Sequence, residues 1–181
     1  MLQRLHHVAY RCLDATETVD FYTNVIGLKF AHAISQDRVP STQEFSPHIH
    51  IFFELGDGSY LAYFELAKAP PPQKDPNTPD WVQHLALEVV DEAALHEGKR
   101  RLTERGIEVV GPTDHGFCKS IYFFDPSGHR MEMTARSETA GELDRFADAA
   151  PAILTEWEER RRSNATGTAS SVGSTVGSPT D

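Results

Sequence analysis

The chain has 181 residues, 39% of them hydrophobic and 24% charged, as in an ordinary soluble protein of one domain or two small modules. Its formal net charge of −10 argues against a nucleic acid as partner, because the phosphate backbone attracts basic surfaces. No apolar run approaches the roughly 20 residues that cross a bilayer, and the N-terminus lacks the apolar stretch of a secretory signal, so we expect a cytoplasmic protein with no membrane partner.

Residues 1–68 predict a first module with the element order βαβββ. The segment 6–14 alternates as a strand does, and Asp14 is placed to cap a helix over 15–26 that ends at Gly27. Three more strands are predicted over 28–34, 48–55 and 59–66. The last two are joined by Gly-Asp-Gly, which is a strong signal for a hairpin.

Residues 81–136 predict a second module of the same order, after a linker over 69–80 that holds five prolines and no periodicity. The segment 83–91 is expected to be a strand, and its final Asp91 is placed to cap a helix over 92–105. The remaining strands are predicted over 107–111, 117–124 and 129–135. The chain therefore contains an internal repeat.

Two further segments follow the second module. Residues 137–162 predict a C-terminal helical extension, although Pro151 should break or kink it. Residues 163–181 are rich in Ser, Thr and Gly and show no apolar pattern, which predicts a disordered tail. We expect no contribution of this tail to the chemistry.

Two histidines hold matching positions in the two modules. A single His on a strand is most often structural, but His7 and His84 would face each other if the modules pack about a pseudo-twofold axis. Imidazole binds zinc, iron, nickel and copper, so both residues are candidate metal ligands. We therefore expect an α+β fold in which two βαβββ modules pack about a pseudo-twofold axis and form a cupped mixed sheet around a metal site.

A carboxylate is needed to complete such a site, and each module ends in a strand that contains one, Glu65 and Glu132. His7, His84 and Glu132 would form a facial triad, which leaves positions open for substrate and oxygen. Glu65 as a fourth ligand would leave fewer open positions and would suit Lewis-acid proton chemistry. The sequence leaves the choice between three and four ligands open.

The two modules, with His7, His84 and Glu132 so placed, resemble the vicinal oxygen chelate superfamily over about residues 4–136. That superfamily includes glyoxalase I, methylmalonyl-CoA epimerase, fosfomycin-resistance enzymes, bleomycin-binding proteins and type I extradiol ring-cleavage dioxygenases. One stretch narrows the resemblance to the extradiol enzymes, because it is similar to the signature around their carboxylate ligand. It reads Thr113-Asp114-His115, five residues, Ile121-Tyr122, two residues, Asp125-Pro126-Ser127-Gly128, three residues and Glu132.

The resemblance implies an Fe(II)-dependent extradiol-type dioxygenase that inserts O₂ into the ring of a catechol-like aromatic compound. In that family the positions that match His115 and Tyr122 lie beside the substrate, and the position that matches Glu132 binds iron. Tyr122 would hydrogen-bond the substrate, and a histidine would move protons between oxygens. The family's usual acid/base histidine is missing before the fourth strand, so His115 is the best substitute, ahead of His48 and His50.

Two other functions stay open. The first is a glyoxalase I-like metal-dependent lyase or isomerase that uses Glu65 as a fourth ligand. The second is a non-catalytic small-molecule binding protein of the resistance type. Fe(II) is the expected metal, with Ni(II), Zn(II) or Mn(II) as alternatives. Many relatives pair as dimers, some of them with a site shared between chains, so the resemblance also implies a homodimer.

Overall fold

The computed structural model describes residues 1–72 and 75–169, and the chain divides into two units, Met1–Ser137 and Glu138–Asp181. The first unit holds both predicted modules, and the second holds one helix. The predicted disordered tail 163–181 overlaps this helix as far as residue 169, and its remainder lies outside the described residues. Within the described ranges, no helix is long and apolar enough to cross a membrane.

The first module has the predicted order of elements. It consists of β1 (His7–Arg11), α1 (Ala15–Asp20), η1 (Phe21–Ile26), β2 (Lys29–Arg38), β3 (Phe45–Glu54) and β4 (Tyr60–Leu66). Asp14 caps α1 as expected, because its Oδ1 accepts a hydrogen bond from the amide of Glu17 at 2.9 Å. The predicted helix changes from α to π at Phe21 and ends at Gly27, whose φ of 93° gives the left-handed turn.

The second module repeats this order with β5 (Leu85–Val89), α2 (Glu92–Glu104), β6 (Val110–Asp114), β7 (Cys118–Phe124) and β8 (Arg130–Arg136). Asp91 caps α2, with its Oδ1 2.7 Å from the amide nitrogen of Ala94. β6 begins at Val110, later than predicted. Its ladder with β7 shifts register between Val110 and Thr113, where Pro112 has no amide proton to donate.

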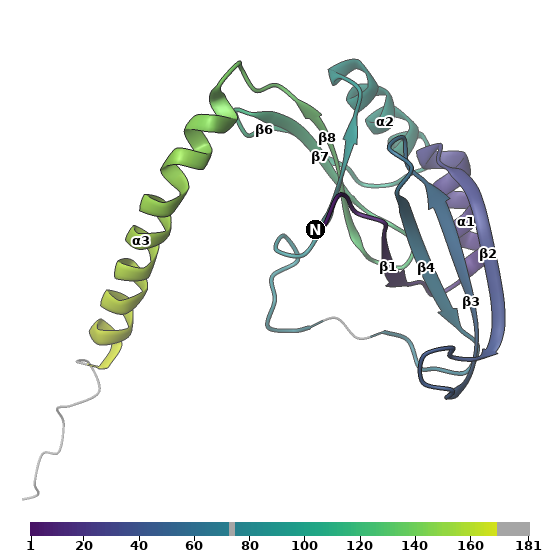
Figure 1. Cartoon of the computed structure of the whole chain (residues 1–181). Coiled ribbons are helices and arrows are strands. Elements are labelled where there is room, and N and C mark those ends of the chain that lie inside the picture. The colour runs from purple at the N-terminus through teal and green to yellow at the C-terminus, as the bar shows by residue number, and fades with distance from the viewer. Residues whose placement is uncertain (73–74, 170–181) are drawn as a thin grey trace, which may run out of the picture. The chain divides into compact units, whose positions relative to one another are not determined.

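The strands form two four-stranded sheets with the same topology, in the orders β1-β4-β3-β2 and β5-β8-β7-β6 (Figure 1). In each sheet, the first and last strands of the module pair in parallel, and the other neighbours pair antiparallel. The predicted α+β fold with two βαβββ modules is confirmed. The two sheets are separate and do not close into one, so each sheet has a pair of faces of its own.

The strand registers of the two modules match residue by residue. Phe52 of β3 lies opposite Ala62 of β4 in the first module. At the equivalent position of the second module, Tyr122 of β7 lies opposite Glu132 of β8. The parallel ladders set Ala9 of β1 opposite Ala62 and its repeat partner Ala86 of β5 opposite Glu132, which fixes this equivalence. Ala62 therefore takes the place of Glu132, and Phe52 takes the place of Tyr122.

One face of each sheet forms the core, and the other face is open. The core-facing residues alternate along the strands and are buried: Ile51, Phe53, Leu61, Tyr63, Ile121, Phe123, Met131 and Met133. Residues of α1, η1 and α2 pack into the same cluster. The guanidinium of Arg101 on α2 donates hydrogen bonds to the carbonyls of Asn24 and Ile26 on η1. The two modules therefore share one core through their helix-covered faces.

A buried polar network joins the two modules inside this core. The Tyr22 hydroxyl donates a hydrogen bond to Oδ2 of Asp125 at 3.0 Å and lies 2.5 Å from the hydroxyl of Tyr63. Oδ1 of Asp125 accepts hydrogen bonds from the amides of Ser127 and His129, at 2.9 and 2.8 Å. Asp125 is only 5% exposed. This carboxylate therefore helps to hold the turn that leads into β8 to the first module, together with the hydrogen bonds between Leu13 and Ser127 and between His129 and Arg11.

Asp125→Ala is expected to lower the free energy of unfolding by about 3 kcal/mol, because a buried hydroxyl and two turn amides lose their charged acceptor. Asp57→Ala is the matched control. Asp57 is exposed, caps the Ser59 amide in the equivalent hairpin of the first module, and should contribute about 1 kcal/mol or less. Urea unfolding followed by circular dichroism measures both losses. Equal losses of unfolding free energy in the two variants would show that Asp125 stabilises only its own turn.

The described residues of the second unit contain one helix, α3 (Glu142–Ala169), which continues through Pro151 (Figure 1). Of the two effects expected of Pro151, a break or a kink, the break does not occur. A proline removes one helical hydrogen bond, and the two alanines before it have the highest helix propensity, so the flanking turns persist. The amide and hydroxyl of Thr139 donate hydrogen bonds to Oε2 of Glu142, at 2.8 and 3.0 Å, and fix the start of α3.

Candidate metal centre

The open face of the second sheet carries two of the three predicted metal ligands side by side. His84 immediately precedes β5, and Glu132 lies on the adjacent strand β8. Nε2 of His84 lies 3.0 Å from Oε2 of Glu132, and Glu132 is only 6% exposed. An imidazole nitrogen and a carboxylate oxygen suit a divalent metal such as iron, manganese, nickel or zinc. This donor pair therefore has the chemistry to hold a divalent metal and could supply two ligands.

Both predicted catalytic residues lie beside this pair. Tyr122 of β7 is the cross-strand neighbour of Glu132, and its hydroxyl lies 2.8 Å from Nε2 of His115, which follows β6. Burial and the neighbouring Glu132 carboxylate raise the pKa of the Tyr122 phenol. Tyr122 therefore keeps its proton near neutral pH and can donate a hydrogen bond. The structure brings His84, Glu132, Tyr122 and His115 together.

Sequence reasoning missed one residue on the same face. Arg130 lies two residues before Glu132 on β8, so its side chain points to the same side of the sheet. Its guanidinium carbon lies 4.5 Å from the centre of the Tyr122 ring, in a cation–π contact. The spacing of two could have identified Arg130, since alternate residues of a strand share a face.

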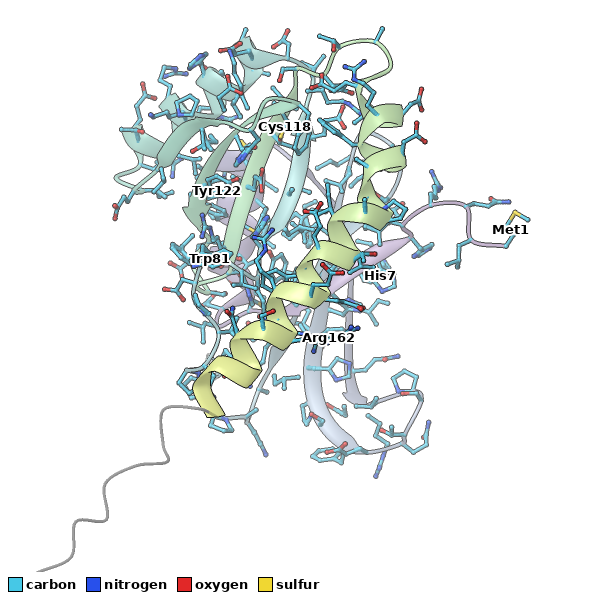
Figure 2. The ribbon with its side chains drawn as sticks, turned by 90° about the vertical axis from the view of Figure 1, so that its left-hand side faces the viewer. Met1, His7, Trp81, Cys118, Tyr122 and Arg162 are labelled. Atoms are coloured by element: carbon cyan, nitrogen blue, oxygen red, sulfur yellow. The ribbon has the colours of Figure 1, made fainter. Side chains whose placement is uncertain are left out.

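His7 lies on the open face of the other sheet and is not joined to these residues. Its Nδ1 lies 2.8 Å from Nδ1 of His6, and its ring centre lies 6.2 Å from that of His50. Figure 2 shows His7 on a strand of the first module and Tyr122 on a strand of the second. The predicted convergence of His7 and His84 is not seen within one chain, because the modules pack through their core faces. Among the described residues, no three His, Cys, Asp or Glu side chains form a group that could hold a metal ion.

Glu65 lies on the core side of its sheet. On β4 it alternates with Phe64 and shares the face of Tyr63, which is fully buried. Its Oε2 accepts a hydrogen bond from the amide of Ala15 at 2.6 Å, so it caps the start of α1. In the repeat, Glu65 holds the place of Ala135. The structure therefore gives Glu65 a helix-capping contact and does not bring it to the other candidate ligands.

His50, which sequence reasoning ranked below His115, has a free ring nitrogen. It stacks on Phe64 with ring centres 3.6 Å apart, and its buried Nε2 has no hydrogen-bond partner among the described residues. Burial, followed by the charges of nearby imidazoles, lowers the pKa of His50 to about 4, so the ring is neutral at pH 7. His50 lines a cavity of about 460 Å³ together with His48, whose Nδ1 is bonded to the Ser46 carbonyl at 2.6 Å.

The amino-acid sequence of the chain is similar to those of known proteins. The family model described as Glyoxalase/Bleomycin resistance protein/Dioxygenase superfamily matches residues 4–133. "Putative ring-cleaving dioxygenase MhqA" of Bacillus subtilis (strain 168) is 29% identical over 141 residues, which cover 76% of this chain and 42% of that protein. The 2-epi-5-epi-valiolone epimerase of Actinomyces sp is 29% identical over 143 residues, which cover 71% of this chain and 77% of that protein. The chain thus spans less than half the length of MhqA.

Solved structures share the fold. The glyoxylase/bleomycin resistance protein/dioxygenase domain from Frankia sp. EAN1pec matches with a TM-score of 0.62 and 17% identity, over 76% of this chain and 100% of that one. The fosfomycin resistance protein FosX from Listeria monocytogenes, complexed with Mn(II), matches with a TM-score of 0.55 and 21% identity, over 79% and 98%. Glyoxalase I of Leishmania major matches with a TM-score of 0.56 and 17% identity, over 87% and 99%.

Proposed function

The chain belongs to the glyoxalase/bleomycin resistance protein/dioxygenase superfamily, and from this premise we propose that it is an Fe(II)-dependent extradiol-type dioxygenase. It would insert O₂ into the ring of a catechol-like aromatic compound. The superfamily also contains epimerases, glyoxalase I and fosfomycin-resistance enzymes, so membership alone supports only a metal-dependent enzyme. The observation that carries the finer proposal is the hydrogen-bonded pair His115–Tyr122 beside His84 and Glu132.

The proposed chemistry divides between metal and protein. Fe(II), when bound by His84 and Glu132, supplies electron transfer from the diol to oxygen. Tyr122, whose pKa is raised, would donate a hydrogen bond to the substrate, and His115 would fix the direction of its hydroxyl. His50 lies beside His7 on the first sheet, with ring centres 6.2 Å apart, and its Nε2 has no partner among the described residues. We therefore assign His50, together with the His7 side of the site, the transfer of a proton between substrate oxygens.

We propose that His7, the third ligand, comes from a second copy of the chain. His7 lies on the open face of the first sheet, and His84 and Glu132 lie on the open face of the second. Both open faces also expose large apolar side chains, with Ile34 37% and Phe124 43% exposed. A twofold axis between copies would set the first sheet of each against the second sheet of the other. This dimer would contain two equal three-ligand sites.

A metal-dependent epimerase is the second candidate. The similarity to 2-epi-5-epi-valiolone epimerase covers 77% of that protein, against 42% of MhqA, at the same identity of 29%. Such an enzyme needs no oxygen. The helix-capping contact of Glu65 counts against the four-ligand variant of this candidate, in which Glu65 would bind the metal.

Oxygen consumption separates the two candidates. Protein reconstituted with Fe(II) under anaerobic conditions, then mixed with oxygen and a panel of catechols, is expected to take up O₂ and form a yellow ring-opened product. An oxygen electrode and an absorbance spectrum measure both. Zn(II)-loaded protein is the control and should consume none, because zinc has no redox chemistry. Absence of uptake across charged, neutral, mono- and disubstituted catechols would contradict the dioxygenase.

A further inference from the structure

We propose that Arg130 binds a carboxylate of the substrate, so that the compound processed at this site is an anionic catechol. The inference rests on the proposed function, because it names the substrate class of the same site. It assigns the substrate a negative charge and assigns Arg130 the role of a residue that determines specificity.

The position of Arg130 places it at the edge of the candidate metal centre. It shares the open face of β8 with Glu132 and is paired across the sheet with Phe124. The parallel register, in which Leu85 lies opposite Met131, sets His84 beside Arg130. A group bound to the guanidinium would therefore lie next to a molecule held by His84 and Glu132.

In the part of the chain that the structure describes, the Arg130 guanidinium forms no ion pair. Its Nε is buried and has no hydrogen-bond partner among the described residues, and its guanidinium makes a cation–π contact with the ring of Tyr122. Arg136, on the same strand and the same face, forms an ion pair with Glu88 at 3.7 Å. A buried donor without an acceptor is unfavourable, so the Nε–H of Arg130 favours a ligand that supplies one.

The geometry of a guanidinium selects the kind of ligand. Its planar set of N–H groups matches the two oxygens of a carboxylate, which it binds through two parallel hydrogen bonds. The contact with the Tyr122 ring holds the Arg130 guanidinium in place, so less freedom is lost when a carboxylate binds. An aromatic acid fits this combination, because its ring would lie towards the metal ligands and its carboxylate towards Arg130.

A cavity of about 560 Å³ gives such a ligand room. Its lining includes Arg130, His84 and Phe124 and the linker residues Asp75 and Asp80, whereas Glu132 and Tyr122 are not among the lining residues. This volume lies in the range of small-molecule sites. The Asp75 carboxylate is already occupied by hydrogen bonds from the amide of Asn77 and the hydroxyl of Thr78. Because two aspartates also line the cavity, a cationic ligand is the alternative, and the experiment has to distinguish it from an anionic one.

Three catechols that differ in one charged group test the proposal. Calorimetric titration of the full-length, metal-free protein compares 3,4-dihydroxybenzoate, 3,4-dihydroxybenzamide and 3,4-dihydroxybenzylamine, which are an anion, a neutral molecule and a cation. The anion is expected to bind at least about tenfold more tightly than the amide, since a charge-assisted pair contributes more than a neutral hydrogen bond. Arg130→Gln should remove this preference, and Arg130→Lys should keep part of it.

Arg136→Gln is the matched control and should leave the preference unchanged, because Arg136 already pairs with Glu88. Equal binding of anion and amide, tighter binding of the cation, no binding of the anion, or an unchanged preference in Arg130→Gln would each overturn the proposal. Oxygen uptake by the Fe(II)-loaded enzyme is read separately. Equal turnover of acid and amide would support ring cleavage but contradict the proposed role of Arg130. A preference for the anion that depends on Arg130, without oxygen uptake, would support the anion site but contradict ring cleavage.

Discussion

Glu132→Gln is expected to abolish metal binding and turnover together. The Glu132 carboxylate is buried, faces His84 at 3.0 Å and brings the negative charge of the proposed triad. An amide keeps the shape of the side chain but cannot supply a charged oxygen. Loss of a group that only orients a ligand weakens metal binding about 10- to 100-fold, so loss of a ligand itself should cost more than about 100-fold. Metal content after dialysis and oxygen uptake measure the two effects.

Glu65→Gln is the matched control for this change. Glu65 lies on the equivalent last strand of the first module, but it faces the core and caps α1 through the amide of Ala15. The variant should bind metal as the unchanged protein does and lose about 1 kcal/mol of stability through the weaker cap. Metal retained in Glu132→Gln, or lost in Glu65→Gln, would contradict the assignment of the ligands.

Mixed dimers of two inactive variants are expected to regain about half of the full activity. One chain carries His7→Ala and the other carries Glu132→Gln, and two affinity tags isolate the dimers that contain one of each. If His7 completes the site of the other copy, one site of such a dimer carries both defects and the second carries none. Oxygen uptake of the purified mixed dimer, compared with both variant homodimers, measures the recovery.

The control for this experiment combines His84→Ala with Glu132→Gln. Both of these residues belong to the second module, 3.0 Å apart in one chain, so every site of that mixed dimer is damaged and no activity should return. A His7→Ala and Glu132→Gln dimer that stays inactive would place all three ligands in one chain. A chain that remains monomeric at assay concentration would contradict the shared site as well.

The fold was predictable from local patterns because several of them agree. The caps Asp14 and Asp91 form the expected hydrogen bonds, and both helices begin where these residues place them. The strands after both helices alternate in polarity, and glycine-containing turns separate the last pair in each module. The repeat then fixed the common topology, since two segments with the same pattern adopt the same arrangement.

The candidate site was predictable only in part. The face of the sheet on which a side chain lies, and its distance from the other site residues, depend on the register of the strands. Glu65 and Glu132 look equivalent as the carboxylates of two final strands, yet the register sets Glu132 against Tyr122 and puts Ala62 in its place in the first module. A shift of three residues exchanges the face of a strand. The separation of His7 from His84 was not predictable, because a repeated sequence does not determine which faces of the two modules pack together.

Along the strands of this chain, side chains that form the core alternate with side chains on the open face that carries the candidate site. Met131 and Met133 are buried in the shared core, whereas Arg130 and Glu132, which alternate with them, point to the open side. Substitutions on the open side leave the packed residues untouched, so new reactions can be acquired through a few changes at little cost in folding. Such a scaffold is highly evolvable. That property accounts for a superfamily in which dioxygenases, epimerases and fosfomycin-resistance proteins share one architecture.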